Sequence, residues 1–174
     1  MTLTHLLPTL RLTMPDPLDR DSWPEFTTAT TTDVVVAGVS LIRLAEWCGT
    51  PCVHTAAAVV PGTGGKPSDS ELAAVVVLRV VGVTPRHGGG LDVRLDGELH
   101  LVAALTAQAR LIGRASTIRD TQAHVGASVI DLPGDLRVGD LLAVPVRGVA
   151  RLHDVDPRRR PAAEGETPLG YCGR

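Results

Sequence analysis

The chain has 174 residues, a length that suits one domain with its own core. Apolar residues make up 44% and aromatic residues only 2%, so the core has to be built from Val, Leu, Ile and Ala. The formal net charge of −2 gives no electrostatic basis for binding nucleic acid. No apolar stretch approaches the ~20 residues of a membrane-spanning helix, so we expect no membrane association.

Neither the N-terminus nor the cysteines indicate secretion. Residues 1–14 contain one Arg and lack the basic-then-apolar order of a signal peptide, which predicts a cytoplasmic protein. The three cysteines are Cys48, Cys52 and Cys172, an odd number that argues against a disulfide framework. Because Cys48 and Cys52 lack the spacing of a CxxC pair, we also expect no metal site.

The first 60 residues predict an irregular arm followed by a strand, a short helix and an extended segment. Ser40 is a good helix N-cap, and Gly49 with Pro51 predicts where that helix ends. The β-branched residues before Ser40 favour a strand. The expected elements are an arm at 1–32 and, within 33–60, a strand at 33–37, a helix at 41–48 and an extended segment at 52–60.

The rest of the chain predicts short strands joined by turns. Residues 61–70 (PGTGGKPSDS) have the composition of a linker, and residues 158–174 that of a tail, with fraying from residue 154. Between them, residues 71–157 predict a main β-barrel, an all-β fold with one short helix. The strands expected there are 72–83, 91–95, 98–104, 109–116, 125–132 and 141–146.

Three segments share their motifs and their order with one known family. They are 38–51 (GVSLIRLAEWCGTP), 76–83 (VVLRVVGV) and 130–145 (IDLPGDLRVGDLLAVP), and 158–164 (RRRPAAE) follows them. These segments resemble the fold-type III pyridoxal-phosphate (PLP) decarboxylases, the diaminopimelate and ornithine decarboxylase family. The resemblance implies a Greek-key-like β-barrel similar to the C-terminal domain of these group IV decarboxylases and of alanine racemase.

The resemblance also implies that the PLP-binding part of the family is missing. In the family, a PLP-binding TIM barrel on the order of 250 residues separates the opening stretch from the strand that re-enters the β domain. Here only a short stretch that includes the linker at 61–70 lies between them. Lys66, the only lysine, lies in that Gly-rich linker and lacks the rigid, desolvated setting that a Schiff base requires. We therefore expect no cofactor.

By the same resemblance, most active-site groups of the family's β domain are replaced. The family's Arg and Tyr of its RPALY motif fall on Val102 and Thr106, and its catalytic Cys falls on Ser116. Asp120 keeps the family's Asp, and the cofactor-contacting Tyr falls on Ala150. Binding a phosphate or carboxylate requires donors or positive charge, and these replacements remove most of both.

Three functions stay open once PLP chemistry is set aside. The favoured one is a decarboxylase-like pseudoenzyme that binds a hydrophobic small molecule or a protein partner. The second is a cofactor-independent enzyme, such as a cyclase of secondary metabolism, that holds its substrate inside the barrel. The third is the β subunit of a split decarboxylase with a separate partner enzyme, against which the lost Arg, Cys and Tyr argue. A homodimer is expected, since family members dimerise and an open half-barrel exposes strand edges.

The barrel mouth is the expected ligand pocket, because apolar walls with a few polar groups commonly bind small molecules there. Glu98 and His100 stand two apart on the expected strand 98–104, so they would share a face and supply acid–base groups. No nucleophile has an evident base, so no catalytic residue is assigned. The candidate pocket residues are Glu98, His100, Val102, Thr106, Ser116, Asp120 and Ala150.

The lysine count leads to a direct test. We expect the purified protein to retain no PLP and to show no imine absorbance after soaking with PLP and gel filtration, because Lys66 offers no desolvated amine. Absorbance spectroscopy of the wild type and of Lys66→Ala measures this. A stoichiometric adduct that disappears in Lys66→Ala would contradict the prediction.

Overall fold

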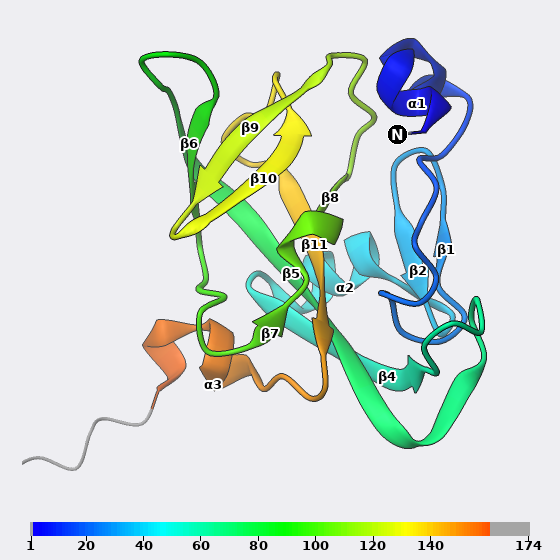
Figure 1. Cartoon of the computed structure of the whole chain (residues 1–174). Helices are drawn as coiled ribbons and strands as arrows, with labels where there is room; N and C mark the ends of the chain where they lie inside the picture. Colours follow the sequence, from blue (N-terminus) through cyan, green and yellow to red (C-terminus); the bar gives the residue numbers. More distant parts are fainter. Residues whose placement is uncertain (1, 161–174) are drawn as a thin grey trace, which may run out of the picture.

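The long strand β5 (Pro67–Pro85) is the centre of the fold. The computed structural model describes residues 2–160, and these form a mostly β structure with a curled half-barrel sheet and few short helices (Figure 1). β5 pairs antiparallel with β4 (Cys52–Val59), β11 (Leu141–Arg147) and β6 (Leu91–Leu95). β5 is long enough to pair with β4 and β11 along residues 67–79 and with β6 along residues 80–85.

β5 reads as a nearly continuous apolar run because both of its faces are buried. Successive side chains of a strand point to opposite faces. Val75 and Val77 therefore pack into one core cluster, while Ala74, Val76 and Leu78 pack into another. All five are fully buried, which accounts for the absence of the polar alternation that a half-exposed strand would show.

The outer part of the sheet is a hairpin that pairs with β6. β9 (Asp120–Val125) and β10 (Ser128–Pro133) form this hairpin, and β9 pairs with β6 in parallel. The strand order in the larger sheet is β10-β9-β6-β5-β11-β7, with β4 on β5 and β8 on β11. The two short strands on β11 are β7 (Ala103–Ala104) and β8 (Arg110–Ile112).

A small three-stranded sheet and one helix pack beside β5. β1 (Thr28–Ala29), β2 (Val34–Val36) and β3 (Val39–Ser40) form the sheet, and α2 (Leu41–Cys48) follows directly. The Ser40 hydroxyl accepts a hydrogen bond from the Arg43 N–H at 3.2 Å, which caps the helix. The remaining helical elements are α1 (Leu3–Leu6), η1 (Pro8–Leu12), η2 (Thr106–Gln108), α3 (Leu152–Val155) and η3 (Pro157–Arg159).

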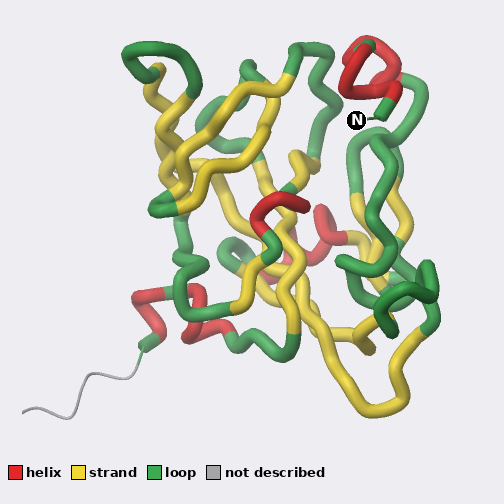
Figure 2. Tube along the Cα trace, in the orientation of Figure 1, coloured by secondary structure: helices red, strands yellow, loops and turns green. Residues whose placement is uncertain are grey.

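Three core clusters hold these elements together. The Trp23 core joins α2 and the small sheet to β5, and its only aromatic member is Trp23, at 1% exposure. A second cluster, which contains Leu78 and is called the Leu78 core below, joins the other face of β5 to β11 and α3. The third cluster, which contains Val80, lies between the β9–β10 hairpin and the C-terminal half of β5. Figure 2 shows short, separate helical segments around the connected strands.

Several expected elements are confirmed. The helix at 41–48 is α2, and the strand at 33–37 is β2 with shorter ends. The segments at 52–60, 91–95 and 141–146 are β4, β6 and β11. In each case, local chemistry such as a cap, a turn or β-branching agrees with the tertiary pairing.

Other expectations were wrong. The expected strand 98–104 is mostly turn, because only Ala103–Ala104 finds a partner strand. The linker expected at 61–70 is shorter, since Pro67 already pairs with Val59. The expected strand 125–132 spans the turn at Gly126, which in the structure separates β9 from β10. The strand β9 before this turn was not expected.

The structure also corrects the expected helix content and the fraying of the C-terminal part. Three short α-helices occur in residues 2–160, rather than one. Of the strand expected at 109–116, only β8 forms. Residues 154–160 are not uniformly frayed, because Val155 is fully buried in the Leu78 core and Asp156 is also buried. The tail expected at 158–174 lies mostly outside the described residues.

The double-sided burial of β5 leads to a stability prediction. Leu78→Ala should lower the free energy of unfolding by about 2–5 kcal/mol, because it leaves a cavity in a fully buried position. Leu72→Ala, on the same strand but half exposed, should cost under about 1 kcal/mol. Urea denaturation followed by circular dichroism measures both, and equal losses would contradict two-sided burial as the source of stability.

Candidate functional site

An apolar cavity opens between β6, the chain at 97–106 and the β9–β10 turn. Its volume is about 660 Å³, within the usual range for small-molecule pockets. We refer to it below as the apolar cavity. Its apolar wall is formed by Val93, Leu95, Leu99, Val102, Ala104 and Val125.

The turns at 97–106 are held in place by backbone hydrogen bonds to α3 and β11. The Glu98 N–H donates to the Val155 carbonyl at 2.8 Å, and the Leu105 N–H donates to the Pro145 carbonyl at 2.8 Å. Gly97 permits the close approach, since a Cβ there would lie 2.7 Å from Leu78 Cδ2 and 2.8 Å from the Val155 carbonyl oxygen. The part of the cavity wall at 97–106 is therefore fixed by tertiary contacts, whereas Val93, Leu95 and Val125 belong to strands β6 and β9.

Glu98 carries the polar contacts at the edge of this cavity. Its Oε2 accepts a hydrogen bond from Arg160 Nη2 at 2.7 Å and lies 3.4 Å from His100 Nδ1. The Glu98 and His100 side chains are 42% and 62% exposed, so this pair is solvated and adds little to stability. Arg94, Thr106 and Ser128 add three more polar side chains to the lining.

The structure brings four of the seven candidate residues to this one cavity. Glu98, His100, Val102 and Thr106 all line it, although they lie on turns and on η2 and not on one strand. Ala150 lines neither this cavity nor the second one described next, because it is buried in the Leu78 core.

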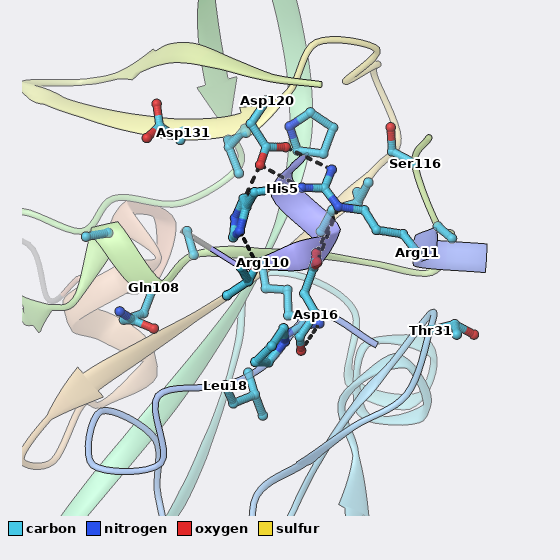
Figure 3. Close-up of a pocket in the computed structure, with 18 of the residues that line it drawn as sticks. His5, Arg11, Asp16, Leu18, Thr31, Gln108, Arg110, Ser116, Asp120 and Asp131 are labelled. Atoms are coloured by element: carbon cyan, nitrogen blue, oxygen red, sulfur yellow. Dashed lines mark hydrogen bonds and ion pairs between the residues drawn. The ribbon is translucent and has the colours of Figure 1, made fainter. Parts of the chain in front are cut away.

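A second cavity, of about 470 Å³, lies between the N-terminal arm, the chain at 107–116 and the β9–β10 hairpin. We call it the arginine cavity, because Arg11, Arg110 and Arg114 all line it. In Figure 3, Arg11 and His5 of the N-terminal arm reach Asp120. Candidate residues Ser116 and Asp120 lie here.

Arg11 and Asp120 form a two-pronged ion pair that fastens the arm. Arg11 Nη1 and Nη2 donate to Asp120 Oδ1 and Oδ2 at 2.9 and 2.7 Å. Arg11 Nε lies 3.1 Å from Asp16 Oδ2, and the residue is only 6% exposed. Burial by itself lowers the pKa of Arg11, but the hydrogen bond to Asp120 and the charges of Asp120 and Asp16 outweigh it and raise the pKa.

Ser116 belongs to a separate, structural network. Its hydroxyl donates to Asp135 Oδ1, and Arg114 donates to both Asp135 and Asp140. Burial of Asp135 raises its pKa, but the hydrogen bonds from Ser116 and Arg114 and the Arg114 charge outweigh burial and lower it. A hydroxyl that donates to an ionised carboxylate is orienting that group, so this contact gives Ser116 no general base.

Sequence reasoning missed the residues that dominate the arginine cavity. His5, Arg11 and Asp16 belong to the arm at 1–32, which carries no periodicity, and Arg110 lies on a strand of only three residues. The one sequence feature that could have indicated this site is Arg11, a single arginine among mostly apolar residues near the N-terminus. Its partner Asp120 is 109 positions away, and no local pattern reveals such a pairing.

Residues 2–160 contain no group of three or more His, Cys, Asp or Glu side chains placed to hold a metal ion. In the same range, no helix is both long and apolar enough to cross a membrane. Cys52 is buried, and burial raises the pKa of its thiol to about 11.

No protein-family model matches the chain, and a search of curated proteins found no similar sequence.

The Arg11–Asp120 ion pair leads to a prediction for the arm. Arg11→Met should lower the free energy of unfolding by about 3–5 kcal/mol, because Asp120 is left charged and largely buried without its partner. Arg86→Gln breaks the exposed Arg86–Asp92 pair and should cost under about 1 kcal/mol. Urea denaturation measures both variants. Equal, small losses would show that the arm is not fastened by this pair.

Proposed function

We propose that this protein binds a small, largely apolar molecule in the apolar cavity. The observation that supports this most directly is a space of about 660 Å³ whose lining is mostly apolar, with five polar side chains, Arg94, Glu98, His100, Thr106 and Ser128. Pockets of this size and character are typical sites for small molecules. The wall is formed by ordered turns and strands, so a ligand would meet a largely pre-formed surface.

Glu98 specifies one feature of the ligand. Arg160 and His100 both approach Oε2 of Glu98, and among residues 2–160 no hydrogen bond uses Oε1. A carboxylate oxygen is an acceptor only. We therefore infer an apolar molecule with a hydroxyl or amine group that donates to Glu98 while its body lies against Val102 and Leu99.

We further infer kinship with the β-barrel domain of fold-type III decarboxylases, as the sequence resemblance implies, with Greek-key-like topology. Two of the resembling segments lie on neighbouring strands, 76–83 within β5 and 130–145 across β10 and β11. Val102 and Thr106, which the resemblance places at substrate-contacting positions, both line the apolar cavity. Neither side chain carries a positive charge, so the family's anion-binding groups are missing at these two positions, and Arg94 is the cationic side chain among the residues that line the cavity.

A cofactor-independent enzyme is a second candidate, supported by the Glu98–His100 contact of 3.4 Å. In that case, His100 would transfer a proton and Glu98 would orient its ring. Native mass spectrometry of protein isolated from its source host identifies the bound molecule. Incubating that molecule with fresh protein then separates the two functions, because a binding protein returns it unchanged and an enzyme does not.

Ala127 offers a way to block the cavity without disturbing the core. This residue is exposed on the β9–β10 turn and lines the cavity mouth. We expect the wild type to bind the neutral probe N-phenylnaphthylamine saturably, with fluorescence enhancement. Ala127→Trp should weaken this binding at least about tenfold, because an indole occupies the space of the ligand.

Val129→Trp is the matched control, since Val129 is exposed on β10 and does not line the cavity. It should bind the probe as the wild type does. Glu98→Gln should weaken binding of the probe by a few-fold, because a neutral amide accepts the amine N–H less strongly than a carboxylate. Non-saturable binding by the wild type, or equal affinity of Ala127→Trp, would rule out this cavity as the ligand site.

A further inference from the structure

Arg110 faces the arginine cavity from β8. Its backbone is fixed opposite Ala143 of β11, so the start of the side chain is set by the sheet. Figure 3 shows the side chain between Asp16 and Gln108, among the residues that surround the cavity. It is the third arginine there, and its contacts differ from those of the other two.

The donors of Arg11 and Arg114 are used by carboxylates, whereas those of Arg110 are not. Arg11 pairs with Asp120 and Asp16, and Arg114 pairs with Asp135 and Asp140. A guanidinium has five N–H donors. Among residues 2–160, the one hydrogen bond from the Arg110 side chain runs from Nη2 to the Asp16 carbonyl at 2.5 Å, and no carboxylate forms an ion pair with it.

Arg110 is half-buried and, among residues 2–160, lacks a direct counter-ion. Burial is the largest influence on its pKa and lowers it, and the nearby Arg11 charge lowers it further, against the opposing effect of Asp16. An arginine does not lose its proton at neutral pH, so partial burial of its charge raises the free energy of the folded protein. An anion in the cavity would offset that cost.

The acidic side chains around the cavity limit which anion fits. Asp16 and Asp120 are paired with Arg11, and Asp19 accepts hydrogen bonds from Ser22 and the Asp21 N–H. Asp131, an exposed residue, also lines the cavity. These carboxylates repel a doubly charged phosphate or sulfate more strongly than a singly charged group.

We propose that the arginine cavity is a binding site for a small monocarboxylate, whose two oxygens accept a forked pair of hydrogen bonds from Arg110. A planar carboxylate matches the planar guanidinium in this geometry. The body of the molecule would lie against the apolar part of the lining, formed by Leu18, Ala109, Leu111 and Leu132.

This site is separate from the apolar cavity. The short helix η2 lies between the two linings, with Thr106 on the apolar cavity and Ala107 and Gln108 on the arginine cavity. The proposal does not depend on the function proposed above, and blocking variants of each cavity keep the two tests distinct.

Benzoate titration tests the proposal on the full chain. In ¹⁵N NMR spectra of the wild type, we expect the Arg110 Nε–Hε signal to shift saturably with benzoate, while sulfate at equal ionic strength shifts it at least about tenfold more weakly. Arg110→Gln should abolish benzoate binding measured by calorimetry. Arg147→Gln removes the same charge from an exposed position of β11 and should leave binding unchanged.

Ala107→Trp provides a test that leaves every charge in place. Ala107 is exposed on η2 and lines the arginine cavity, so an indole there should weaken benzoate binding at least about tenfold. Ala127→Trp, in the apolar cavity, should not affect it. Absence of saturable benzoate binding by the wild type, or loss in Arg147→Gln equal to that in Arg110→Gln, would overturn the proposal.

Discussion

The pairing of β5 with three strands at once is the constraint on which the other elements depend. β4, β6 and β11 all take their register from this strand, and a shift of one residue would exchange its two buried faces. Since Val75 and Leu78 belong to different core clusters, such a shift would disrupt both. The register break between Val80 and Gly82 lets the strand bend, so that β6 and the β9–β10 hairpin curl away from β4.

This curl creates the two cavities. A half-barrel leaves concave space that the chain has to cover with turns, and the segment between β6 and β8 provides that cover. The turns before η2 form part of the wall of the apolar cavity, and η2 with the residues after it forms part of the arginine cavity. The N-terminal arm encloses the second space, held there by the buried Arg11–Asp120 ion pair.

The two cavities differ in the chemistry of their polar groups. In the apolar cavity, the Glu98 and His100 side chains are solvated, so their contact adds little to the stability of the fold. In the arginine cavity, Arg11 is buried and paired with two carboxylates, whereas Arg110 is half-buried and most of its donors have no partner among residues 2–160. The first arrangement suits an apolar molecule with one polar end, and the second suits an anionic group.

The sequence by itself determined the elements whose signals are local. The Ser40 cap with Gly49 defines α2, and the Val-rich run at 72–83 defines the central strand, since capping and β-branching act within a few residues. The sequence also placed Glu98 and Val102 among the pocket residues, although the strand assumed for them does not form.

Tertiary structure alone decided the contacts that span the chain. The pairing of Arg11 with Asp120, and the turns that bring Glu98 and Thr106 to one cavity, arise from packing across long sequence separations. No periodicity encodes such contacts, because the energy that fixes them is the burial of charge and apolar surface once the sheet has curled.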